Sequence, residues 1–165
     1  MRYLSYVALI LLIVPLQTTL TEMLSLSGIK PDLGLIAVFV IGYLHGEMDG
    51  LVVGGLVGVM MDLFSGGVLG ANLVTKLMVG LGGGLLGRVL LDLRGSAILI
   101  AVFVVSLAAG CLFFVLAAAG SGRVVFRPVF LWIILPQALF DAASALILSR
   151  LLPRRARSRS VAWMG

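Results

Sequence analysis

Residues 30 to 72 read KPDLGLIAVFVIGYLHGEMDGLVVGGLVGVMMDLFSGGVLGAN and contain the clearest structural pattern in the chain. This stretch contains two apolar runs, 33–44 and 50–64, which are joined by a short polar elbow with the sequence HGEMD. A third apolar run starts at Ala71, directly after a glycine-containing turn. Apolar runs that follow one another with so few charges are typical of helices that lie in a lipid bilayer.

The composition of the whole chain agrees with this interpretation. Of its 165 residues, 61% are hydrophobic and only 12% are charged, whereas roughly a quarter of a soluble domain is charged. We therefore predict an all-α integral membrane protein with one transmembrane domain, 1–152, and a basic cytoplasmic tail, 153–165. The net charge of +5 does not indicate a nucleic-acid-binding face, because five arginines near the C-terminus supply it: Arg150, Arg154, Arg155, Arg157 and Arg159.

Hydropathy predicts a bundle of six transmembrane helices. A helix rises ~1.5 Å per residue and needs ~20 residues to cross the hydrocarbon core. The second and third segments offer only ~18 and ~22 Å, so they are either short spans or a re-entrant pair. The first segment contains Pro15 and Gln17 and lacks a signal-peptidase site, so we expect it to be retained. The six segments are 3–25, 33–44, 50–64, 71–91, 96–119 and 128–150.

The distribution of basic residues predicts the orientation. With the N-terminus inside, eight basic residues lie near inner helix ends and three near outer ends, as the positive-inside rule requires. Both termini are thus expected in the cytoplasm. The basic tail either anchors the chain to anionic lipid headgroups or docks a cytoplasmic partner.

Glycines at every fourth position predict close helix packing in the third and fourth segments. Small residues at this spacing allow two backbones to approach closely in lipid, where no hydrophobic force drives helices together. Such a surface faces either a neighbouring span or a partner protein. The glycines concerned are Gly50, Gly54 and Gly58 in the third segment, and Gly80, Gly83, Gly84 and Gly87 in the fourth.

Among the charged residues that fall inside the predicted spans, Asp62, Lys76 and Asp141 are the candidates for a polar site. Asp62 and Lys76 lie near the outer ends of consecutive segments, so we predict an ion pair between them. Its role is either structural, as a lock or a helix-end cap, or that of a coupling-ion or substrate site. Asp141 lies much deeper, with Gln137 one turn away. It is expected to be protonated, hydrogen-bonded to another span, or in contact with a partner's helix.

Catalysis is not expected from this sequence. The only histidine, His45, has no second ligand at metal-binding spacing, so we predict neither a metal nor another cofactor. An intramembrane aspartyl pair would need Asp62 and Asp141 side by side, and helical rise separates their expected depths by ~17 Å.

Three pieces of the chain together resemble the bacterial rod shape-determining MreD family. Pro31 and Asp32 open the second segment, and the elbow around Gly46 leads into the glycines that begin with Gly50. The third piece is DLFSGG, which starts at Asp62 and leads to LGAN with Gly70 and Asn72. The specific part of the resemblance covers about 30–72, while the rest agrees in hydropathy and length.

The resemblance implies a non-enzymatic scaffold in the bacterial inner membrane. Such a protein binds the bitopic protein MreC and supports rod shape and lateral peptidoglycan synthesis, in a complex with MreB, RodA and a class B penicillin-binding protein. It also implies the six-helix fold of the substrate-binding components of vitamin transporters. A component of an energy-coupling-factor vitamin transporter is therefore the alternative. Two observations count against it: the first segment lacks small residues at every fourth position, and the outer loops are short.

Overall fold

The computed structural model describes residues 31–65, 68–89, 96–121 and 125–151, and all regular structure in these ranges is helical. The helices begin and end within a few residues of the apolar segments seen in the sequence. The expected span 3–25 and the basic tail 153–165 lie outside the described residues. The helical elements are α2 (Leu33–His45), α3 (Glu47–Ser65), α4 (Ala71–Val89), α5 (Ser96–Ser121), α6 (Phe126–Val129), the π-helical turn η1 (Phe130–Ile134) and α7 (Leu135–Leu151).

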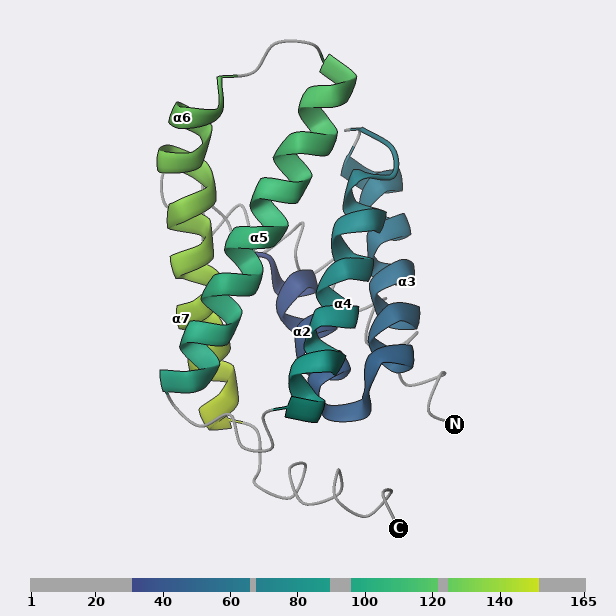
Figure 1. The fold of residues 1–165 in the computed structure, drawn as a ribbon, viewed down its shortest axis with the longest axis vertical. Helices are drawn as coiled ribbons and strands as arrows, with labels where there is room; N and C mark the ends of the chain where they lie inside the picture. Colours follow the sequence, from purple (N-terminus) through teal and green to yellow (C-terminus); the bar gives the residue numbers. More distant parts are fainter. Residues whose placement is uncertain (1–30, 66–67, 90–95, 122–124, 152–165) are drawn as a thin grey trace.

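The elements α6, η1 and α7 form one continuous helix, so the described part contains five helices (Figure 1). The π turn precedes Pro136 and is closed by the N–H of Leu135, which donates to the carbonyl oxygen of Phe130 five residues earlier. A proline inside a helix removes one hydrogen bond and its ring crowds the preceding turn. A π turn is one way in which a helix accommodates such a local disturbance.

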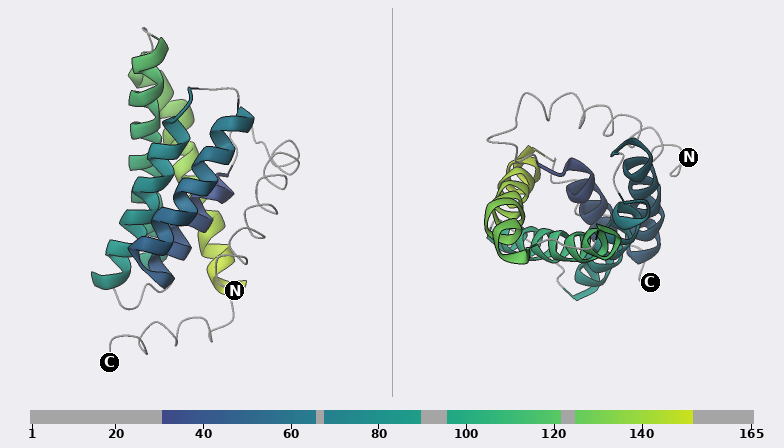
Figure 2. Two further views of the ribbon diagram at one scale, coloured as in Figure 1. Left: turned by 90° about the vertical axis from the view of Figure 1, so that its right-hand side faces the viewer. Right: turned by 90° about the horizontal axis from the view of Figure 1, so that it is seen from above.

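The helices fall into two groups. Helices α2, α3 and α4 pack together, while α5 packs against α7, and a contact between α4 and α5 joins the groups (Figures 1 and 2). The α2–α3 elbow, the end of α4 and the start of α5 lie at the same end of the molecule as the end of α7 (Figure 1). These are the helix ends that the distribution of basic residues assigns to one side of a membrane.

Helices α3 and α4 are in backbone-to-backbone contact through their glycines. A Cβ atom added to Gly80 would lie 2.1 Å from the carbonyl oxygen of Gly50, and one added to Gly54 would lie 2.4 Å from that of Lys76. Gly58 meets the Cα of Leu73 in the same way. The expected close packing of these segments is therefore present, and it lies within the chain.

Helix α2 packs against the same glycine-rich face of α4. A Cβ at Gly83 or Gly87 would meet the carbonyl oxygen of Phe39 or Tyr43 of α2, whereas one at Gly84 would meet the backbone of Glu47, the first residue of α3. Gly42 of α2 approaches Gly80 as closely. The glycines of α4 thus form one face that contacts both α2 and α3, and these two helices also contact each other.

Within the residues that the structure describes, two helical stretches, Ala97–Ala119 and Phe126–Ile147, are long and apolar enough to cross a membrane. Few of their residues are fully buried, and Val104, Trp132 and Ile147 are examples of exposed large apolar residues. Helix α3 also presents an apolar outer face, since Val52, Leu56, Val59 and Leu63 recur at helical spacing and are all exposed. Such surfaces suit lipid better than water.

The two short segments differ in length. Helix α3 has 19 residues and reaches about 28 Å, close to the thickness of the hydrocarbon core. Helix α2 has 13 residues and reaches only about 20 Å. Helix α2 therefore begins partway along the bundle, beside the middle of α7, and not level with the ends of α3 and α5 that lie away from the α2–α3 elbow (Figure 1).

Candidate functional site

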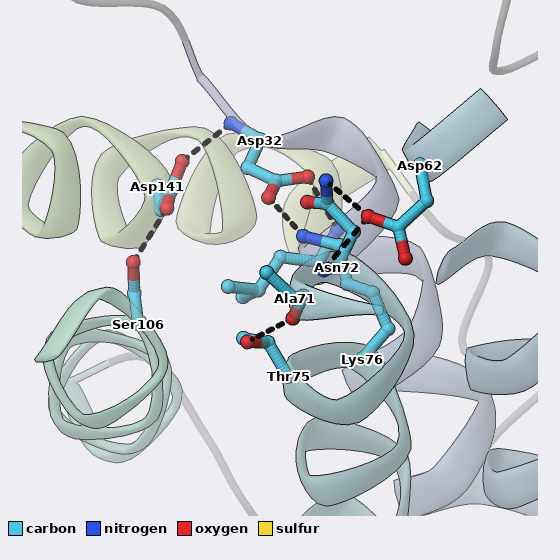
Figure 3. A network of polar contacts seen from close by, with 9 residues as sticks. Asp32, Asp62, Ala71, Asn72, Thr75, Lys76, Ser106 and Asp141 are labelled. Atoms are coloured by element: carbon cyan, nitrogen blue, oxygen red, sulfur yellow. Dashed lines mark hydrogen bonds and ion pairs between the residues drawn. The ribbon is translucent and has the colours of Figure 1, made fainter. Parts of the chain in front are cut away.

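The N-terminal ends of α2 and α4 meet α5 and α7 at a group of polar residues inside the bundle (Figure 3). Asp32 caps α2, and its Oδ1 accepts a hydrogen bond of 2.8 Å from the N–H of Leu35. Its other oxygen, Oδ2, forms an ion pair with Nζ of Lys76 on α4. The Lys76 side chain is 2% exposed and that of Asp32 is 14% exposed. A single carboxylate thus caps one helix and neutralises a lysine buried on another.

Asp141 connects three helices. It is fully buried in α7, and its Oδ1 accepts the main-chain N–H of Asp32 at 2.7 Å. Its Oδ2 accepts the hydroxyl proton of Ser106 on α5 at 2.5 Å. Burying such a group is costly unless hydrogen bonds replace those to water, and here two donors do so. Of the alternatives for this residue, the one present is hydrogen bonding to neighbouring helices.

Asp62 lies at the end of α3 and binds the start of α4. Its two oxygens accept the main-chain N–H groups of Gly70, Asn72 and Leu73 at 2.9–3.0 Å, and also the side-chain amide of Asn72 at 3.0 Å. The first N–H groups of a helix have no partner within the helix, and a carboxylate there also interacts favourably with the helix dipole. Asp62 is therefore a cap supplied by the preceding helix.

The predicted ion pair between Asp62 and Lys76 is wrong. Lys76 pairs with Asp32, while Asp62 is occupied by the turn that leads into α4. The prediction compared only the depths of Asp62 and Lys76 and did not consider Asp32 as a partner. Because α2 starts deeper, its capping carboxylate reaches Lys76, one turn into α4.

Two motif glycines occupy left-handed backbone positions. Gly46, between α2 and α3, has φ +99°, and Gly70, before α4, has φ +90°. Residues with a Cβ rarely adopt such angles, which explains glycine at both turns. The N–H of Gly46 donates to the carbonyl oxygen of Gly42 and closes α2, whereas the N–H of Gly70 donates to Asp62. At the same elbow, Nε of Arg88 lies 2.9 Å from Oε1 of Glu47.

A cavity of about 380 Å³ adjoins the polar residues. Its polar wall contains Asp32, Asn72, Thr75, Lys76, Ser106 and Gln137, and its remaining wall is made largely by apolar residues of α5 and of the η1 region. Gln137, expected to accompany Asp141, lines this cavity, while Asp141 lies behind its wall with no exposed surface. The hydroxyl of Thr75 donates to the carbonyl oxygen of Ala71 at 2.7 Å.

Sequence reasoning missed Ser106 and Thr75. Ser106 is a polar residue in the middle of a long apolar run, and this isolation was the available signal. Thr75 precedes Lys76 and does not belong to any of the sequence motifs. The site contains no group of three or more His, Cys, Asp or Glu side chains placed to hold a metal ion within the described residues.

Comparison of the chain with protein-family models, with curated proteins and with solved structures finds no match. The geometry alone supports a rigid polar junction of four helices, with two carboxylates, one ammonium group and an adjoining cavity.

Proposed function

We propose that this protein is an MreD-type scaffold of the cell-wall elongation machinery in the bacterial inner membrane. In this proposal it has six spans with both termini in the cytoplasm, and it performs no catalysis. It binds MreC within the bilayer and supports the complex that contains MreB, RodA and a class B penicillin-binding protein. Rod shape and lateral peptidoglycan synthesis depend on that complex.

One observation carries the proposal: the residues that resemble the family motif are engaged in holding helices together. Asp62 binds Gly70 and Asn72, and Asp32 binds Lys76 and the first turn of α2. The glycines Gly50, Gly54 and Gly58 lie against the backbone of α4. Motif residues used in this way suit a protein whose task is to present fixed helix surfaces.

The outer surface supports the choice of a partner within the membrane. The row Val52, Leu56, Val59 and Leu63 leaves one face of α3 apolar and uncovered by the described residues. Because a partner helix and lipid acyl chains both satisfy such a face, it is available for a bitopic protein without further rearrangement.

One observation favours the alternative function, a substrate-binding component of a vitamin transporter. The cavity of about 380 Å³ falls within the range of roughly 300–1,000 Å³ that is typical of small-molecule sites. Its polar wall would orient a ligand, and its apolar wall would bury it.

Depletion of this protein in its own rod-shaped host, followed by microscopy, tests the proposal. We expect rounded cells, and we expect tagged protein extracted from membranes to carry MreC with it. Unchanged cell shape together with lost uptake of one vitamin would establish the alternative instead.

The matched control for the extraction uses two glycines of α4. Gly80→Leu places a side chain where Gly50 lies and should abolish recovery of MreC. Gly82→Leu extends from a position where nothing lies within 4 Å of an added Cβ, and we expect it to retain MreC and rod shape.

A further inference from the structure

We propose that the cavity binds one amphiphile whose neutral head group bears hydroxyl or amide groups, with its apolar part lying against α5 and the η1 turn. The head group would lie at the polar wall shown in Figure 3, beside Lys76 and Asn72. This inference rests on the cavity and not on the proposed scaffold function, so either can fail without the other.

Lys76 supplies the first argument. Its ammonium group carries three protons, and within the described residues Asp32 is its one ion-pair and hydrogen-bond partner. The side chain is 2% exposed and lines the cavity. Buried donors are rarely left without acceptors, so acceptor oxygens are expected on the cavity side.

The neighbouring polar groups define the rest of the head-group site. Asn72 uses its side-chain N–H₂ on Asp62, which leaves its carbonyl oxygen as an acceptor at the wall. The Thr75 hydroxyl donates to Ala71 and can still accept. Gln137 lines the same wall and brings an amide with both donor and acceptor atoms. Hydroxyl and amide groups both donate and accept, and they match this mixture.

Charge excludes the other classes of head group. A phosphate or carboxylate would approach Lys76, but Asp32 already neutralises this lysine and a second carboxyl group, Asp141, lies behind the same wall. Like charges at short distance in a low-dielectric interior repel strongly. A cationic head group would have to compete for carboxylates that already accept hydrogen bonds. Asp32 accepts from Leu35 and Lys76, and Asp141 accepts from Asp32 and Ser106. A neutral head group avoids both conflicts.

The second wall of the cavity calls for an apolar tail. It is formed by Ala109, Gly110, Phe113, Ala117, Ile133 and Ile134, among others. Phe113 is 37% exposed and Ile133 is 51% exposed, so this wall is not sealed by the described residues. Beside it, the ring of Phe126 contacts those of Phe114 and Phe130, with centroids 5.2 and 5.4 Å apart. Contact between this apolar surface and water is unfavourable, whereas an acyl or isoprenoid chain would remove both its own surface and that of the wall from water.

Photo-crosslinking in vesicles tests the proposal. The full chain is reconstituted in vesicles of phosphatidylethanolamine and phosphatidylglycerol that contain a small amount of diacylglycerol with a diazirine in one acyl chain. A parallel sample contains phosphatidic acid with the same acyl chains. We expect several-fold more labelling by diacylglycerol of the peptides that contain Phe113 and Ile133.

Two matched tryptophan variants locate the label. Ala118→Trp fills part of the cavity and should lower this labelling several-fold. Val115→Trp changes the same helix at a side chain that is 59% exposed and does not line the cavity, and it should leave labelling unchanged. Ala109→Leu, at another lining position, provides a second filled cavity if Ala118→Trp does not fold.

Three results would overturn the proposal. Equal labelling by the two probes would show ordinary contact with bulk lipid. Labelling that survives in both filled-cavity variants, each eluting as a folded monodisperse species, would place the probe elsewhere. Native mass spectrometry of protein taken directly from membranes should reveal a bound lipid, and a water-soluble metabolite or no adduct at all would contradict it.

Discussion

The main-chain N–H of Asp32 donates to the carboxylate of Asp141, which lies 109 residues later in the chain, over a distance of 2.7 Å. This bond fixes the start of α2 against the middle of α7. The side chain of Asp32 also caps α2 and binds Lys76 on α4. A single residue therefore links α7 to both α2 and α4. The polar junction is thus the place where the two groups of helices are held in register.

Replacement of Asp141 should destabilise the bundle in proportion to the acceptors removed. Asp141→Leu leaves the Asp32 N–H and the Ser106 hydroxyl without acceptors, and each interhelical hydrogen bond in a membrane protein contributes roughly 1–2 kcal/mol at most. Asp141→Asn keeps one acceptor oxygen and should cost about half as much. Thermal unfolding in detergent, followed by size-exclusion chromatography, measures the difference. Leu139→Ala, at an exposed position of the same helix, should have little effect, and equal losses in Asn and Leu variants would contradict the prediction.

Lys76 should be energetically coupled to Asp32 and not to Asp62. Removing one partner of a buried ion pair costs about 3–5 kcal/mol, because the other charge is left buried and uncompensated. Lys76→Met is therefore expected to destabilise strongly, and Asp32→Asn in the same chain should recover part of the loss. A double-mutant cycle based on denaturation in detergent measures the coupling. The parallel cycle with Asp62→Asn should be nearly additive, and strong coupling there would restore the rejected pair.

Gly80 and Gly82 should respond in opposite ways to alanine. At Gly80 the added methyl group would lie 2.1 Å from the carbonyl oxygen of Gly50, so α3 and α4 must separate and the unfolding temperature should fall sharply. At Gly82 an added Cβ meets nothing within 4 Å, and alanine is a better helix former than glycine by up to about 1 kcal/mol. Gly82→Ala should thus be neutral or mildly stabilising. Similar unfolding temperatures for the two variants would show that the contact is not structural.

Asp62 should control the local stability of the first turn of α4. Asp62→Ala removes the acceptor for three main-chain N–H groups, so amide hydrogen exchange over residues 70–74 should accelerate. Loss of a capping side chain typically costs about 0.5–2 kcal/mol. Exchange measured by mass spectrometry tests this, with Asp62→Asn expected between the wild type and the alanine variant. Unchanged exchange in this turn, or a rise spread evenly over all helices, would refute the capping role.

The elements of this fold follow from local pattern. The apolar runs around the elbow at Gly46 and the turn at Gly70 locate the ends of α2, α3 and α4, because both turns need a backbone conformation that glycine adopts easily. The spacing of Gly50, Gly54 and Gly58 also indicated close helix contact, because residues four apart lie on one face of the same helix. The partner of that surface could not be deduced from spacing and was left open between another span and another protein.

Local sequence pattern therefore accounts for the described helices, their turns and the glycine surfaces, since each depends on residues less than a few turns apart. Which charges meet depends instead on how the helices pack against one another. Pairing of Lys76 with Asp32, and of Asp141 with the Asp32 backbone and Ser106, depends on the depth at which α2 begins relative to α4, α5 and α7. That depth is set by packing between helices, so no periodic pattern in the sequence of a single helix indicates it.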